Sequence, residues 1–178
     1  MLTTSSTTQF EEVVRRLGVP RSSRDGGPVF EKLRVVTAAD AHPHSQSARY
    51  GTDAFPFHTD TAHWRVPARY VALRAEARSS RPTIVVDLRD AITVATRRLL
   101  QDALFTVVNG RRSFLASAWD GALRLLRYDP TCMRAATRAA LRASAALDEI
   151  GHTVPPIYVD WARGRTLIID NWRCLHAR

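Results

Sequence analysis

The feature that most restricts the fold of this chain is a series of short apolar segments, each bounded by turn residues, in its second half. Segments 83–88 (TIVVDL) and 165–170 (RTLIID) are rich in β-branched residues, which is typical of strands. Asn109-Gly110 separates two further segments and indicates a hairpin turn. The segments do not alternate regularly with helical ones, so a doubly wound fold is disfavoured. We expect a mainly β domain with covering helices (α+β), and a jelly-roll, or double-stranded β-helix, is the leading candidate.

The remaining pattern predicts three helices and one domain. Apolar residues at helical spacing predict helices over residues 9–17, 90–104 and 131–150, with Asp90 as a cap of the second and Gly151 ending the third. The Ser/Thr-rich residues 1–8 are expected to be frayed, and residues 38–56 to form a loop over a site. Further strands are expected at 70–75, 105–108, 113–118, 123–128, 157–161 and 173–176, with a strand or short helix at 30–36. No repeat or linker divides the chain, so residues 1–178 are expected to form a single domain.

Composition narrows the functional classes. The formal charge is +9, but Lys32 is the only lysine and the arginines are scattered, which favours solvated surface over a nucleic-acid site. No apolar run approaches the roughly 18 residues that span a bilayer, and the N-terminal segment lacks the apolar core of a secretory signal. Cys132 and Cys174 form no CxxC pair and are expected to be reduced thiols. We therefore expect a cytoplasmic protein with no membrane partner.

One set of residues is a candidate metal site. His58 and Asp60 are two apart, and on a strand such residues point to the same face, so an imidazole and a carboxylate would converge. His176 is a candidate third ligand, and two histidines with one carboxylate form the facial triad that binds Fe(II) with open positions. A lone His-x-Asp triplet is compatible with chance, and an isolated His176 is compatible with an ordinary residue near a terminus. The assignment therefore depends on the surrounding segments.

Four of those segments, in order, resemble one family. They are FPFHTDTAHW (55–64), RPTIVVDLRDA (81–91), LRYDPTCM (126–133) and VDWARGRTLIIDNWRCLHAR (159–178). They are similar to segments of the taurine dioxygenase / clavaminate synthase-like superfamily of Fe(II)- and 2-oxoglutarate-dependent dioxygenases, nearest the γ-butyrobetaine hydroxylase branch. The last segment is the most specific, since its Trp, Gly, Asp-Asn, His and Arg recur at the family's spacing.

The resemblance implies both an activity and residue roles. It implies a non-haem Fe(II) dioxygenase that uses 2-oxoglutarate and O₂ to hydroxylate an unactivated C–H bond of a small organic substrate. His58, Asp60 and His176 look like the iron ligands, and Thr83 matches a Thr that hydrogen-bonds the cosubstrate carboxylate. Composition alone explains Thr83 equally well as a β-branched strand residue. Arg178 matches the Arg of the family's His-x-Arg.

One departure from the family concerns the cosubstrate. The family holds the remote carboxylate of 2-oxoglutarate with an Arg on a strand well after the distal His, whereas this sequence ends two residues after His176. We expect weak 2-oxoglutarate binding unless Arg178 or a completing subunit replaces that contact, and a homo-oligomer is left open. Two other functions remain as alternatives. One is a degenerate, non-catalytic member of the fold that acts as a binding or assembly subunit, and the other is a basic nucleic-acid-binding module.

Overall fold

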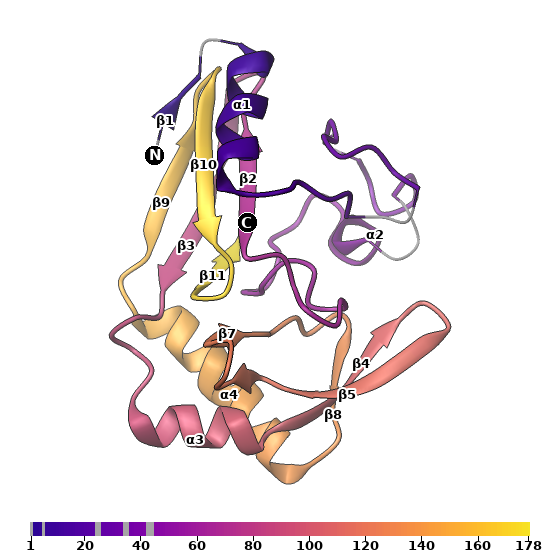
Figure 1. Ribbon diagram of the computed structural model, residues 1–178, viewed down its shortest axis with the longest axis vertical. Helices are drawn as coiled ribbons and strands as arrows, with labels where there is room; N and C mark the ends of the chain where they lie inside the picture. The colour runs from indigo at the N-terminus through magenta and orange to yellow at the C-terminus, as the bar shows by residue number, and fades with distance from the viewer. Residues whose placement is uncertain (1, 5, 24–25, 34–35, 42–44) are drawn as a thin grey trace.

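A computed structural model describes residues 2–4, 6–23, 26–33, 36–41 and 45–178, and shows antiparallel strands accompanied by helices (Figure 1). The helices are α1 (Thr7–Leu17), α2 (Gln46–Tyr50), α3 (Val94–Asp102) and α4 (Arg138–Thr153). The strands are β1 (Leu2–Thr3), β2 (Tyr70–Arg74), β3 (Ser79–Asp87), β4 (Leu104–Asn109), β5 (Arg112–Ser117), β6 (Trp119–Asp120), β7 (Leu125–Leu126), β8 (Met133–Ala135), β9 (Ile157–Trp161), β10 (Arg165–Asp170) and β11 (Cys174–Ala177). The expected mainly β architecture with covering helices is confirmed.

Two three-stranded sheets form a sandwich in the upper part of Figure 1. One sheet has the strand order β1-β10-β2 and the other the order β11-β3-β9, and all of their pairings are antiparallel. A cluster of apolar side chains fills the space between them, with Val85 and Val159 from one sheet and Leu167 and Ile169 from the other. Because successive side chains of a strand point to opposite faces, the alternating apolar residues of these segments specify this layer.

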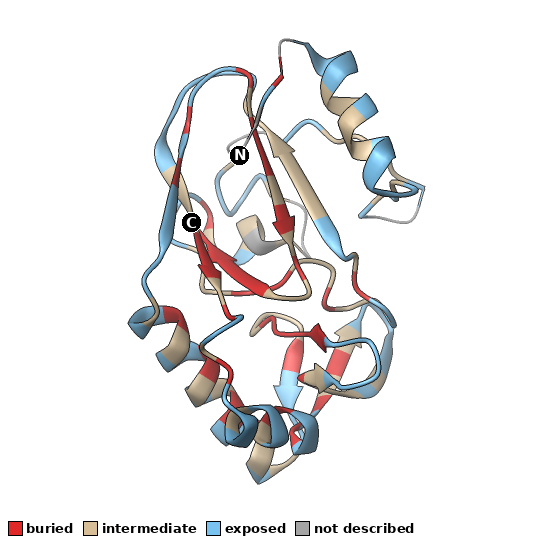
Figure 2. Cartoon of the chain, turned by 60° about the vertical axis from the view of Figure 1, so that its left-hand side comes forward, coloured by how far each residue is buried: buried red, intermediate tan, exposed pale blue. Residues whose placement is uncertain are grey.

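The C-terminal end of strand β3 is covered on both faces, and Figure 2 colours the buried residues of the chain red. Val85 belongs to the core between the two sheets, whereas the neighbouring Val86 belongs to a second core. That second core contains Leu100 of α3 and Leu147 of α4. The continuous apolar run of β3 therefore follows from burial on both sides rather than from a half-exposed strand.

The lower part of the molecule combines the sheet β5-β4-β8 with α3 and α4 (Figure 1). Strands β4 and β5 form the expected hairpin, and Gly110 in its turn has φ +58°, a conformation that glycine adopts without a steric cost. The short pair β6-β7 adjoins this region. The expected strand over 123–128 is reduced to β7, because Leu125 and Leu126 alone pair with Trp119-Asp120.

Two expected helices are shorter than their sequence patterns indicate. The segment expected to start a helix at 131 first forms β8, in which Met133 pairs with Val107 of β4, and α4 begins only after Thr137 caps it. Similarly, α3 begins after Thr93, whose hydroxyl accepts a hydrogen bond from the backbone N–H of Thr96 at 3.1 Å, and not at Asp90. Gly151 does not end α4, which runs to Thr153.

The N-terminal third contains more regular structure than the sequence indicates in some places and less in others. Strand β1, within the segment expected to be frayed, pairs with β10, and the Thr4 side chain is buried against Thr166 at 3.0 Å. The loop expected over 38–56 includes α2, and its residues 42–44 lie outside the described residues. Residues 30–33 and 36 form neither strand nor helix, and 34–35 are not described. None of the described helices has the length and apolarity needed to cross a membrane.

Candidate metal centre

His58 and His176 are brought together by one antiparallel β-bridge between distant segments. The backbone N–H of each residue donates to the carbonyl of the other, with both distances 3.0 Å. Directly opposed residues of an antiparallel pair project to the same side, so the two imidazoles lie next to each other, with ring centroids 4.4 Å apart. The expected regular strand over His58 and Asp60 is absent, since His58 forms only this bridge and the chain turns at Asp60.

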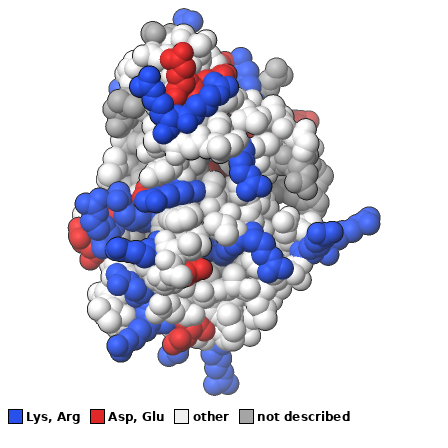
Figure 3. All heavy atoms as spheres, in the orientation of Figure 1, with Lys and Arg blue, Asp and Glu red and all other residues white. Residues whose placement is uncertain are grey.

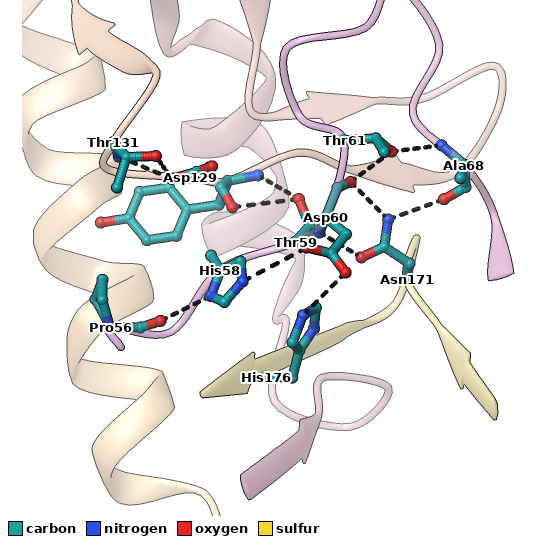
Figure 4. Close-up of polar contacts among 11 residues, drawn as sticks. Pro56, His58, Thr59, Asp60, Thr61, Ala68, Asp129, Thr131, Asn171 and His176 are labelled. Carbon is teal, nitrogen blue, oxygen red and sulfur yellow. Dashed lines mark hydrogen bonds and ion pairs between the residues drawn. The ribbon is translucent and has the colours of Figure 1, made fainter. Parts of the chain in front are cut away.

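The turn after His58 brings the carboxylate of Asp60 to the two rings (Figure 4). One oxygen lies 3.6 Å from Nε2 of His58, and the other lies 3.6 Å from Nε2 of His176. One donor atom from each residue lies within 4.8 Å of the other two. The two His side chains are almost completely buried, whereas the Asp60 side chain is 42% exposed, so the centre opens to solvent on the carboxylate side.

Hydrogen bonding selects the nitrogen that faces the centre. Nδ1 of His58 lies 2.8 Å from the carbonyl oxygen of Pro56, which can only accept, so Nδ1 carries the proton and Nε2 of the neutral ring presents a lone pair. Nδ1 of His176 is buried and has no hydrogen-bond partner among the described residues. A metal-binding His is commonly held through its second ring nitrogen, and His58 has this arrangement.

The electrostatics of the centre favour the ionised form of the Asp60 carboxyl and the protonated form of the neighbouring His58. Burial by itself would raise the pKa of Asp60, but the charges and hydrogen bonds of His176 and His58 hold that pKa far below its ordinary value. Burial would likewise lower the pKa of His58, but the hydrogen bond and charge of Asp60 raise it instead. A bound cation would supply positive charge at the same place, and it would bind the ionised carboxylate and neutral imidazoles.

Thr59, between the two candidate ligands His58 and Asp60, anchors this segment to Tyr128. Its backbone N–H donates to the carbonyl of Tyr128 at 2.6 Å, and the N–H of Tyr128 donates to the Thr59 hydroxyl at 3.0 Å. Thr59 is fully buried. The backbone of Tyr128 therefore braces the segment of the candidate ligands, a contact that the sequence did not reveal.

Arg127 is almost completely buried and acts through its side chain. Its guanidinium donates to the carbonyls of Ala62, Trp64 and Arg65, at 2.8 Å for the last of these. It thus holds the chain that leaves the metal centre. Asp129 accepts hydrogen bonds from the backbone and side chain of Thr131.

The two residues expected to bind the cosubstrate lie in different surroundings. Val85 is opposite His176 in the β11-β3 register, so Thr83 lies on the same face of the sheet as His176. The indole N–H of Trp161 donates to the Thr83 hydroxyl at 3.0 Å, which leaves the hydroxyl hydrogen available to another acceptor. The guanidinium of Arg178 donates to the carbonyls of Gly51 and Asp53 at 2.7 and 3.1 Å.

The fold of this chain matches that of a class of solved enzymes, the non-haem iron oxygenases. The oxygenase OrfP in complex with Fe matches with a TM-score of 0.59 and 22% identity, over 71% of this chain and 45% of that chain. Asparagine oxygenase in complex with Fe(II), 3-hydroxyasparagine and succinate matches with a TM-score of 0.63 and 16% identity, over 80% and 49%. OrfP in complex with Fe and L-homoarginine matches with a TM-score of 0.55 and 20% identity, over 70% and 46%.

These likenesses establish the fold, so the expected jelly-roll is confirmed. The chain spans just under half the length of each of these solved structures. No protein-family model and no curated protein matches the sequence. The nearer resemblance to the γ-butyrobetaine hydroxylase branch stays a prediction.

Proposed function

We propose that this chain carries the iron site of a non-haem Fe(II)- and 2-oxoglutarate-dependent dioxygenase, with His58, Asp60 and His176 as ligands. The observation that carries the proposal is the convergence of these three side chains, from segments more than a hundred residues apart, within 4.8 Å. Two imidazoles and one carboxylate are the donor set of the facial triad, which leaves positions open for cosubstrate and O₂. The fold shared with Fe-containing oxygenases supports the same assignment.

The residues of the centre fit such a metal chemically. Nε2 of His58 presents a lone pair because Pro56 holds Nδ1, and Asp60 is ionised and reachable from solvent. When bound, Fe(II) with 2-oxoglutarate would supply the activation of O₂ needed to hydroxylate an unactivated C–H bond. The chain itself contributes the placement of the ligands, and the buried rings exclude water from one side of the centre.

For the cosubstrate we propose Thr83 as a binding residue. It shares the sheet face of His176, and its hydroxyl keeps a hydrogen that is not used by Trp161. Arg178 is the second candidate, but its guanidinium already holds the loop at residues 51–53 and lies 3.9 Å from the ring centroid of Phe55. Thr83 is therefore the better supported of the two.

An amino acid or a close derivative is the proposed substrate class. The support comes from the solved structures, in which OrfP holds L-homoarginine or (3S)-hydroxy-L-Arg and asparagine oxygenase holds a hydroxyasparagine. The presence of all three candidate ligands next to one another weighs against the alternative of a degenerate, non-catalytic subunit. Against a nucleic-acid module, Lys and Arg side chains on the face in Figure 3 form separate groups with acidic side chains among them.

The first test is anaerobic titration with Fe(II), or with Co(II) as a spectroscopic proxy. We expect the unchanged chain to bind one ion, and the double variant His58→Ala/His176→Ala to lose that binding. His63→Ala is the matched control, since His63 is close in sequence to the ligands but outside the triad, and it should keep one ion. Equal metal content in the double variant would contradict the site.

The second test asks for catalysis. The iron-loaded protein is supplied with O₂, 2-oxoglutarate and a panel of amino acids, and succinate is measured. Succinate that depends on both O₂ and one of the amino acids supports the dioxygenase. Stoichiometric iron without any succinate would instead support the degenerate subunit.

A further inference from the structure

Asn171 lies in the turn between β10 and β11 and is completely buried. Its side-chain oxygen accepts from the backbone N–H of Asp60 at 2.7 Å. Its side-chain nitrogen donates to the carbonyl of Asp60 at 2.9 Å and to the carbonyl of Ala68 at 2.8 Å (Figure 4). The amide thus uses its oxygen and both hydrogens, and it brackets the peptide groups on either side of one metal ligand.

Thr61, the residue after Asp60, has a backbone conformation that is unfavourable for a threonine. Thr61 has φ +54°, which is uncommon for any residue with a Cβ and especially so for a β-branched one. Its hydroxyl donates to the carbonyl of Asp60 at 2.7 Å and accepts from the backbone N–H of Ala68 at 2.8 Å. A conformation of this kind persists only where the surroundings hold it.

We propose that Asn171 is a positioning residue for Asp60, which holds the Asp60–Thr61 turn in the conformation that points the carboxylate at both imidazoles. The inference rests on the proposed metal site and adds to it a residue that touches neither metal nor substrate. A turn that relaxes to negative φ at Thr61 would swing the Asp60 carboxylate away from His58 and His176.

The place of Asn171 in the chain strengthens the proposal. Asn171 and His176 belong to the same turn and strand, so the bonds to Asp60 tie the carboxylate ligand to the segment that carries the distal His. The His58–His176 bridge makes a second tie between the same two parts of the chain. Together, the bridge and the Asn171 bonds hold the three proposed ligands in fixed positions relative to one another. Of these two connections between the described segments, only the Asn171 bonds act directly on the peptide groups of Asp60.

The test compares Co(II) binding by the unchanged chain with that of Asn171→Ala and Asn171→Asp. Outer partners of metal ligands typically change affinity by about 10- to 100-fold, and we expect a loss of this size with an altered Co(II) d–d absorption spectrum. Trp172→Phe is the matched control. It removes the bond from the Trp172 indole to the carbonyl of Pro67 at 3.0 Å, a bond in the same region in which Asp60 takes no part. That variant should keep the affinity and the spectrum of the unchanged chain.

Adding Thr61→Gly to Asn171→Ala separates positioning from general destabilisation. Glycine adopts positive φ about as readily as negative φ, so the double variant removes the penalty that Asn171 opposes. We expect it to fold even if Asn171→Ala does not, and to recover part of the Co(II) affinity expected to be lost on removal of Asn171. Unchanged affinity and spectrum in both Asn171 variants, with normal binding by the unchanged chain, would overturn the positioning role alone. No binding by the unchanged chain would overturn the proposed metal site and this inference with it.

Discussion

Gly151 allows α4 to pass close to the segment that carries His58, the first proposed metal ligand. A Cβ placed on this residue would lie 2.7 Å from Cδ2 and 3.0 Å from Cγ of Phe57, the residue before His58. Cγ is fixed near the backbone, so the ring cannot avoid the new methyl group by a small rotation of its outer atoms. Gly151→Ala must therefore move Phe57, the helix, or both.

The two effects of Gly151→Ala oppose each other, and their sizes decide the outcome. Replacing glycine by alanine within a helix normally stabilises it by about 0.5–1 kcal/mol. Overpacking a filled site typically costs about 1–3 kcal/mol, which is the larger effect. We therefore expect the substitution to lower the free energy of unfolding by about 1–2 kcal/mol, opposite in sign to the usual helix effect.

A double-mutant cycle with Phe57→Leu tests this reasoning. The smaller side chain makes room for the methyl group, so the double variant should be more stable than the sum of the single changes by about 0.5–3 kcal/mol. The free energies come from urea denaturation of the four proteins without added metal. A Gly151→Ala protein as stable as the unchanged chain, or a cycle that is simply additive, would refute the proposed contact.

Two further outcomes are expected. Thr83→Val should weaken 2-oxoglutarate binding to the anaerobic Co(II) form by about 10- to 100-fold, because it removes a hydrogen bond to a charged group. Trp161→Phe keeps the Thr83 hydroxyl and should not weaken the binding. Calorimetric titration measures both variants. Burial raises the pKa of Tyr128 above its ordinary value of 10.0, and Asp148, which accepts from the phenol at 2.9 Å, adds to this. Because the unfolded chain ionises this Tyr first, the free energy of unfolding should fall as pH rises above about 10, and Tyr128→Phe should reduce that fall in denaturation at about pH 7 and 11.

The sequence predicted strands correctly where the turn residues and β-branched residues of the segment itself determine them. The hairpin of β4 and β5 follows from Asn109-Gly110 between apolar runs, and β3 and β10 follow from β-branched stretches. The expected helix over 131–150 is wrong at its start, because Met133 enters the core and pairs with β4. An Ala/Arg-rich stretch carries no local record of that distant partner, and tertiary pairing outweighs helix propensity there.

In the candidate site, too, the sequence predicted the residue types but not the contacts with distant segments. Residue type and family resemblance identified His58, Asp60 and His176. The sequence predicted that His58 and Asp60 converge because they share a strand face, but a bridge and a turn also position them. A bridge to β11 aligns the two histidines, and the side chain of Asn171 bonds to the backbone N–H and carbonyl of Asp60. No periodicity within residues 55–64 could indicate a partner more than a hundred positions away.

The wide separation of the ligands along the chain has a consequence for stability. The centre exists only when β11 lies beside both β3 and the segment of His58, so the unfolded chain cannot present the same donor set. A metal that binds the folded chain alone stabilises it by about 2.7 kcal/mol at a hundred times its dissociation constant. The bound metal would stabilise the packing of segment 55–60 against β11, because few of the described hydrogen bonds join these two segments. Metal binding should therefore protect the amides of His58 and His176 from hydrogen exchange more than those of the β4-β5 hairpin, which contributes no ligand.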